Sequence, residues 1–171
     1  HLEITIFRMQ EEQNIKVKVS EPIVVYRESI ERNNSGRPFE GKSPNRHNRF
    51  YIECEPLPQD VINALREGQF GDGPVRTKDA KETGNKFAEF GMDKDLMRKI
   101  YAIHGTNVFV NDTKGIQNLH ETRELMIEGF NDVCKKGPTA EEPLMGVLVR
   151  LVDAKLHEDA IHRGPAQTIP A

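Results

Sequence analysis

Two segments with alternating apolar residues, far apart in the sequence, place the strictest limit on the fold. Residues 49–55 read RFYIECE and residues 146–156 read GVLVRLVDAKL. Such alternation predicts strands that bury one face. Between these segments, residues 114–135 carry apolar side chains at helical spacing, and a Gly-Pro pair ends the pattern. A chain that mixes strands and helices in this way is expected to form a two-layer α+β domain.

Weaker patterns predict the remaining elements. Residues 1–10 fit a helix or a strand equally well, and the Gly and Pro content of residues 33–45 predicts a loop. Elsewhere, alternating or β-branched residues favour strands, and apolar stripes favour helices. The expected strands lie at 15–19, 22–31 and 107–111, and the expected helices at 58–67, 77–90 and 93–101.

The composition indicates a globular, highly solvated chain. Of its 171 residues, 36% are hydrophobic and 30% are charged, which suits one compact core with at most a small appended piece. No apolar run approaches the ~20 residues of a membrane helix, and we expect a cytoplasmic fragment of a longer protein. Two cysteines without C-x-x-C spacing fit a reducing compartment. Cys54 and Cys134 are expected to be buried thiols.

Residues 36–43 read GRPFEGKS and match the phosphate-binding pattern G-x-x-x-x-G-K-[ST]. A true phosphate loop precedes a helix whose N-terminus faces the phosphates. Here Pro44 disfavours helical angles at Ser43, and strand alternation follows. A P-loop-type nucleotide-binding enzyme is therefore the less favoured interpretation of this segment.

Two sets of histidines and carboxylates have some of the features of a metal site. The run HEDAIH has one residue more than the H-E-x-x-H motif, so in a helix His157 and His162 diverge by about 140°. His120 and Glu124 lie four residues apart on a predicted helix, where a surface ion pair is the simpler interpretation. We therefore expect no metal site, and without a G-x-S-x-G turn we expect no catalytic residue.

Two loops at the ends of the main strands carry histidine, arginine and glycine. The first reads KSPNRHNR (residues 42–49) and the second reads HEDAIHRGPAQ (residues 157–167). If the two strands lie side by side, both loops meet at one tip. Arginine pairs with phosphate and histidine stacks on exposed bases. The residues alone fit an RNA-binding tip and plain solvent-exposed loops equally well.

The same loops, together with VSEPIVVYRES near the start, resemble translation elongation factor 2 of archaea and eukaryotes, the relative of bacterial elongation factor G. The loop motifs GKSPNRHNRFYIE and LHEDAIHRGPAQ are long and specific, whereas residues 57–105 are the least diagnostic. By this resemblance, residues 1–19 are the tail of the factor's third domain. Residues 20–171 are its fourth domain, truncated at the C-terminal end, with the fold of domain 2 of ribosomal protein S5.

The resemblance implies a non-catalytic arm of a GTP-dependent translocase. In that family, the fourth domain enters the decoding-centre A site of the ribosome and contacts transfer RNA and messenger RNA. GTP and Mg bind in another domain, so no cofactor is expected in this chain. The implied partners also include the diphthamide-synthesis enzymes and ADP-ribosylating toxins, and no membrane. Pro165 and Ala166 follow the motif HRG, as is typical of archaeal members.

The resemblance assigns site residues to both loops. His162 corresponds to the histidine that is converted to diphthamide, whose fixed cationic group strengthens contacts with phosphates. A free-standing RNA-binding module with the same fold is the remaining alternative. Gly164 is expected to let the backbone turn tightly. The other residues implied to lie near RNA are Lys42, Ser43, Pro44, Asn45, Arg46, His47 and Arg49 in the first loop, and His157, Asp159, Ile161, Arg163 and Gly164 in the second.

Overall fold

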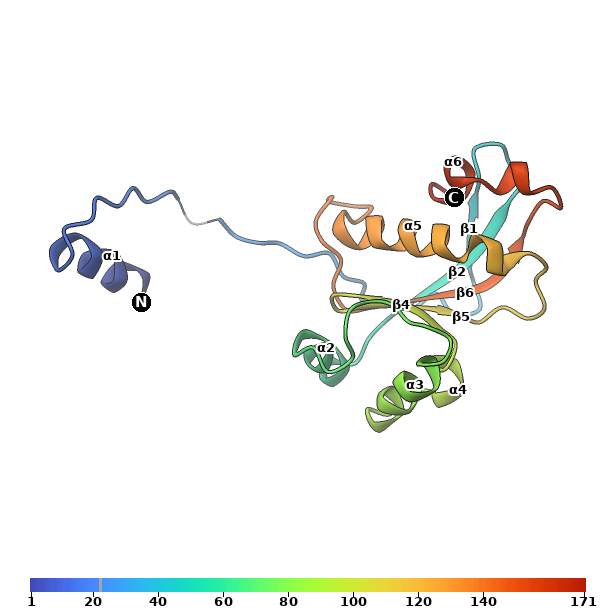
Figure 1. Ribbon diagram of the computed structural model, residues 1–171, viewed down its shortest axis with the longest axis horizontal. Coiled ribbons are helices and arrows are strands. Elements are labelled where there is room, and N and C mark those ends of the chain that lie inside the picture. Colours follow the sequence, from blue (N-terminus) through green and yellow to red (C-terminus); the bar gives the residue numbers. More distant parts are fainter. Residues whose placement is uncertain (22) are drawn as a thin grey trace.

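A mixed six-stranded sheet forms the centre of the computed structural model, which describes residues 1–21 and 23–171 (Figure 1). The strand order is β1-β2-β6-β5-β4-β3. β5 and β6 pair in parallel, and the other neighbours pair antiparallel. The strands are β1 (Phe39–Lys42), β2 (Arg49–Pro56), β3 (Gly73–Pro74), β4 (Ile100–His104), β5 (Asn107–Asn111) and β6 (Val147–Lys155).

Helices lie on both faces of this sheet, with α5 on one face and α2, α3 and α4 on the other (Figure 1). The predicted α+β class is confirmed. The helices are α1 (Leu2–Glu11), α2 (Gln59–Arg66), α3 (Ala80–Glu89), α4 (Lys94–Met97), α5 (Arg123–Lys135) and α6 (Pro165–Thr168), with the 3₁₀ turns η1 (Leu119–Thr122) and η2 (Ala160–Arg163).

Two hydrophobic clusters pack against opposite faces of the sheet, as alternation along β5 shows. Val108 and Val110 belong to the cluster with α2, α3 and α4. Phe109 points the other way and stacks on Phe130 of α5, with ring centroids 5.4 Å apart. A strand buried on both faces is apolar at successive positions, as β5 is. The expected two layers thus hold for α5 and the sheet, and the three other helices add a partial third layer.

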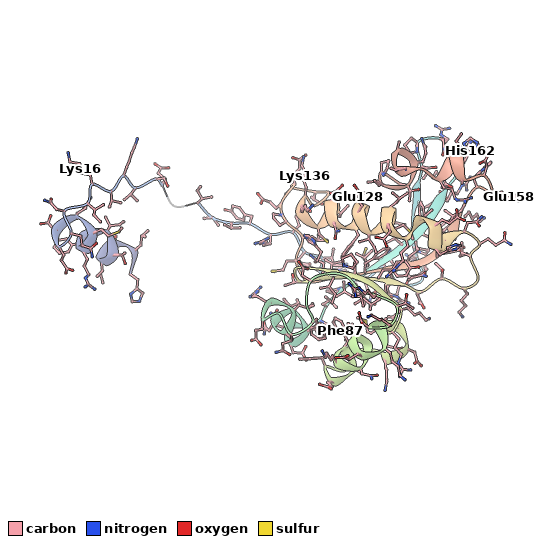
Figure 2. All side chains as sticks on the ribbon, viewed as in Figure 1. Lys16, Phe87, Glu128, Lys136, Glu158 and His162 are labelled. Atoms are coloured by element: carbon pink, nitrogen blue, oxygen red, sulfur yellow. The ribbon has the colours of Figure 1, made fainter. Side chains whose placement is uncertain are left out.

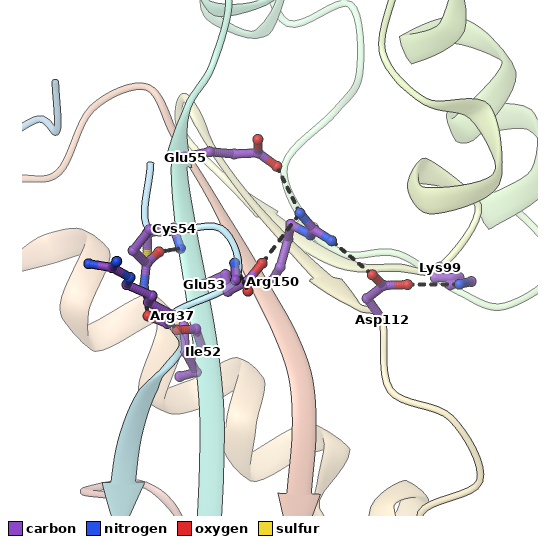
Figure 3. Close-up of polar contacts among 10 residues, drawn as sticks. Arg37, Ile52, Glu53, Cys54, Glu55, Lys99, Asp112 and Arg150 are labelled. Atoms are coloured by element: carbon purple, nitrogen blue, oxygen red, sulfur yellow. Dashed lines mark hydrogen bonds and ion pairs between the residues drawn. The ribbon is translucent and has the colours of Figure 1, made fainter. Parts of the chain in front are cut away.

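On the face of the sheet that carries α2, α3 and α4, charged side chains occupy the part over β2 and β6 (Figure 3). Arg150 on β6 contacts Asp112 at 3.0 Å and both Glu53 and Glu55 at 3.6 Å. Lys99 also donates to Asp112, at 2.9 Å. Burial alone raises the pKa of the Asp112 carboxyl, but the two cationic donors hold it below its ordinary value. The two cations of this network offset two of its three carboxylates.

The N-terminal segment differs from the prediction. Residues 15–19 form no strand, and the predicted strand at 22–31 is reduced to a single bridge between Glu28 and Leu144. Pro22 lies outside the described residues. Ile23 is 85% exposed, and α1 buries no residue. β-branched residues favour a strand only where neighbouring strands supply hydrogen bonds and packing, and the described strands supply neither here.

Glu28 attaches this segment to the loop after α5. Its carboxylate accepts backbone N–H bonds from Ala140 at 2.7 Å and from Thr139 and Glu142 at 3.1 Å. Burial alone raises the pKa of Glu28, but these bonds bring it below its ordinary value. The Glu28 carbonyl also accepts from Met145 N–H, at 2.7 Å. The predicted domain boundary between residues 19 and 20 stays a prediction.

Three further elements depart from the sequence patterns. The expected helix at 93–101 ends at Met97, and β4 begins at Ile100 because that segment pairs with β5. The predicted loop at 33–45 contains β1, which pairs with β2. The long predicted helix begins only at η1, since Asn118 adopts a left-handed conformation with φ of 60°. Pairing between segments distant in sequence outweighs local preference in the first two cases.

An apolar cleft of about 510 Å³ separates α5 from β2 and β6, and the last residues of the chain lie along it. Two glycines allow this close approach. A Cβ on Gly129 of α5 would lie 2.9 Å from the Ile169 carbonyl oxygen, and one on Gly41 of β1 would overlap the Ala171 oxygen. Cys54 is half-buried in this cleft, whereas Cys134 is buried as predicted.

Candidate nucleic-acid interface

Two loops meet at one end of the sheet because β2 and β6 are antiparallel neighbours. The first residue of β2, Arg49, pairs with the last residue of β6, Lys155. The first tip loop (residues 43–48) and the second tip loop (residues 156–164) therefore lie side by side, which confirms the prediction of a shared tip. Figure 2 shows His162 at this end of the domain and Lys136 at the other end of α5.

Asn48 joins the two tip loops with its side chain. It is fully buried, at 0% exposure. Its Nδ2 donates to the His162 carbonyl oxygen at 2.7 Å, and its Oδ1 accepts the His157 N–H at 3.1 Å. The Ser43 hydroxyl, which is also buried, accepts the Asn48 N–H at 3.0 Å. A buried amide is stable when its polar atoms are bonded in this way.

Three histidine rings gather at the outer side of this junction. The ring centroid of His47 lies 4.9 Å from that of His157 and 4.8 Å from that of His162. The centroids of His157 and His162 are 4.5 Å apart. His157 Nδ1 accepts the Asp159 N–H at 3.1 Å, which places the proton of a neutral ring on Nε2. HEDAIH forms a turn and η2 rather than an α-helix, so the divergence that a helix would impose on His157 and His162 does not arise.

Arg163 points into the domain instead of toward solvent. It is only 5% exposed, and it donates to the carbonyl oxygens of His157 and Glu158 and to the carboxylate of Glu121 in η1. These bonds fix the second tip loop to the start of α5. Its guanidinium is thus occupied internally, which argues against the predicted contact with RNA for this residue.

A second connection runs between the first tip loop and α6. Asn45 N–H donates to Gln167 Oε1 at 2.9 Å, and Asn45 Nδ2 donates to the His162 carbonyl oxygen at 3.3 Å. Thr168 adds a hydroxyl bond to the Arg163 carbonyl oxygen. The predicted need for glycine at Gly164 is wrong, because its φ of −66° suits any residue and an added Cβ would meet no atom within 4 Å.

The outer surface of the tip carries charges of both signs, with Glu158 and Asp159 exposed as well as the cations, and one large exposed apolar side chain, Ile161. Arg46 is exposed in a left-handed conformation with φ of 61°. Lys42 and Arg49 share the carboxylate of Glu40, at 2.8 and 3.2 Å, and the hydrogen bond from Lys42 is the main cause of the lowered pKa of Glu40. The predicted residues that are exposed are Lys42, Pro44, Arg46, His47, Arg49, Asp159 and Ile161; Asn45, His157, His162 and Gly164 are half-buried; Ser43 and Arg163 are buried.

Sequence reasoning missed the residues that hold the tip together. Asn48 and Gln167 lie inside the two loop motifs, but neither was assigned a role. Asparagine at a loop-strand junction is a typical turn residue, and this was the available signal for Asn48. Nothing local to Glu121 indicates its bond to Arg163, because the two residues are 42 positions apart.

The structure excludes the phosphate-loop interpretation of residues 36–43. Within this segment, β1 pairs with β2 and Lys42 is bound to Glu40, while Ser43 is buried. The next element is β2, whereas a phosphate loop requires a helix there. Over residues 1–21 and 23–171, no group of three His, Cys, Asp or Glu side chains is arranged to hold a metal ion. No helix in the same ranges has the length and apolar character to cross a membrane.

Comparison with known proteins finds relatives along the whole chain. The family described as "Elongation factor G, domain IV" matches residues 73–171. Over 171 residues, the chain is 50% identical to elongation factor 2 of Pyrococcus horikoshii, 52% identical to that of Picrophilus torridus and 50% identical to that of Pyrococcus furiosus. Each alignment covers 100% of this chain and 23% of the relative. The chain therefore spans about a quarter of the length of these curated relatives.

Proposed function

The chain belongs to the family of elongation factor G domain IV, and on this premise we propose that it is the ribosome-engaging domain of a GTP-dependent translocase of protein synthesis. Its two tip loops enter the decoding-centre A site and contact transfer RNA and messenger RNA during translocation. The identity of about 50% to archaeal elongation factor 2, which extends over the whole chain, supports this proposal.

The observation that carries the proposal is the convergence of the two tip loops at one end of a rigid sheet. A tip held by buried hydrogen bonds projects its side chains with little conformational freedom, as a precise contact with RNA requires. Arg46 presents an exposed guanidinium there, and the His47 ring lies beside it in the chain. Guanidinium groups bind phosphates, and imidazole rings stack on bases, so the chemistry suits RNA.

His162 is the proposed site of diphthamide modification. Its side chain is half-buried and contacts two other imidazole rings, while its backbone is held by two asparagines. A histidine so placed is accessible to a modifying enzyme and is still fixed in direction. The diphthamide-synthesis enzymes, and ADP-ribosylating toxins that act on diphthamide, are accordingly proposed partners of this tip.

GTP hydrolysis is proposed to occur in another domain of the factor. In the segment that resembles a phosphate loop, Lys42 is bound to a carboxylate and no helix N-terminus is available for phosphates. This chain therefore contributes to translocation by occupying space and contacting RNA, without a cofactor of its own.

The test is a translocation assay with full-length factor. We expect His162→Ala and Arg46→Ala to slow single-round translocation or to raise frameshifting, while GTP hydrolysis on the ribosome is retained. Arg76→Ala is the matched control, because Arg76 is an exposed arginine near β3, at the far edge of the sheet. Normal translocation and normal frame maintenance in both tip variants would refute the proposed function.

A further inference from the structure

The His162 backbone is held from two directions by side chains of the first tip loop. Its carbonyl oxygen accepts hydrogen bonds from Asn48 Nδ2 at 2.7 Å and from Asn45 Nδ2 at 3.3 Å. A carbonyl oxygen has two lone pairs, so both acceptor positions are filled. The first tip loop thus determines where the residue that carries the proposed modification lies.

Asn48 is the stronger of these two connections because burial leaves its side chain no alternative partner in water. At 0% exposure, it donates to His162 and to the Ser43 hydroxyl and accepts from His157. It therefore holds both histidines of the second tip loop at once. An aspartate has nearly the same shape but lacks the amide donors, so it would place an oxygen against the His162 carbonyl oxygen.

Gln167 provides a second hold on the first tip loop, through Asn45. Its Oε1 accepts the backbone N–H of Asn45, and the side-chain Nδ2 of Asn45 in turn donates to the His162 carbonyl oxygen. Gln167 is half-buried in α6. The first tip loop is consequently fixed at Asn48 and at Asn45, one on each side of the left-handed residue Arg46.

We propose that Asn48 and Gln167 are positioning residues that hold His162 against His47, so that the two tip loops contact RNA as one rigid unit. This inference rests on the proposed function of the tip. Neither residue needs to touch RNA, because each acts through the backbone of the residue that it holds. Loss of either connection should separate the His47 and His162 rings while the β2 and β6 pairing remains.

The first measurement is the contact between the two rings in full-length factor with ¹³C-labelled histidine. The ring centroids are 4.8 Å apart, so the wild-type protein should give a nuclear Overhauser effect between His47 and His162. We expect Asn48→Asp and Gln167→Ala to abolish it. Gln167→Glu keeps the acceptor oxygen and should restore it, and Asn63→Asp makes the same chemical change as Asn48→Asp on an exposed position of α2.

The second measurement is the rate of single-round translocation by the same variants. We expect Asn48→Asp and Gln167→Ala to slow it roughly tenfold, the effect of losing about one hydrogen bond of positioning, with Gln167→Glu and Asn63→Asp unchanged. Ring contact that survives in both variants would overturn the proposal. Rates that stay normal although the contact is lost, while His162→Ala is slow, would also overturn it. Normal translocation by His162→Ala would instead refute the proposed function.

Discussion

Arg163→Gln should destabilise the domain without removing an exposed charge from the tip. In the folded protein, the guanidinium bonds to two backbone carbonyl oxygens and to the Glu121 carboxylate. Loss of a hydrogen bond costs about 1 kcal/mol, or about 1.5–3 kcal/mol when one partner is charged. The Glu121 side chain is 45% exposed, so water compensates part of the loss of the ion pair. We therefore expect the free energy of unfolding to fall by about 2–4 kcal/mol.

The assay is equilibrium unfolding in urea, followed by circular dichroism, with Arg46→Gln as the control. Arg46 is exposed and has no ion-pair partner among the described residues, so its replacement should change the free energy of unfolding by less than about 0.5 kcal/mol. At a temperature where both variants are folded, Arg46→Gln should impair the proposed RNA-dependent steps more than Arg163→Gln does. An Arg163→Gln variant as stable as the wild type would refute the internal role assigned to this residue.

Four further predictions concern the body of the domain. Phe87→Ala should lower the free energy of unfolding by about 3–5 kcal/mol in urea, because Phe87 is fully buried and stacks on Phe70 at 4.0 Å. Gly41→Ala should cost about 1–3 kcal/mol and speed hydrogen exchange in α6, since the new Cβ would overlap the Ala171 oxygen. Burial raises the pKa of the Cys134 thiol to about 12. Iodoacetamide at about pH 8.5 should therefore modify Cys134 far more slowly in the folded protein than in the denatured chain. The same raised pKa means that stability should decline as the pH rises from about 9 toward 12, which urea unfolding at several pH values would detect.

Elements with strong periodicity were predictable from the sequence, and those formed by pairing alone were not. β2, β6, α2 and the body of α5 follow their hydrophobic patterns because one face of each is buried. β1 reads FEGK, which has no apolar alternation, and it forms because β2 offers a free edge. The segment around Val24 and Val25 shows the reverse case, with high strand preference but no strand beside it among the described residues.

In the candidate site, too, only some features could be predicted from the local sequence. The side chains at the tip surface were predictable, because loops at the ends of two strands project outward wherever those strands are neighbours. The direction of each side chain was not, and Arg163 illustrates why. Its sequence context, between His162 and Gly164, gives no sign of the carboxylate of Glu121, which approaches from η1. Arginine at a tip is exposed by default, and only the fold reveals a buried partner.

The geometry of the tip depends on the sheet in a specific way. Asn48 is 114 positions from His162 and 109 from His157, so its bonds form only when β2 and β6 have paired in register. Substitutions in the hydrophobic clusters should therefore affect the tip only through unfolding of the whole domain. Substitutions at Asn48 and Gln167 should alter the tip while the sheet stays folded. His162, the proposed modification site, is thus placed by the side-chain amides of Asn45 and Asn48 rather than by its own neighbours in sequence.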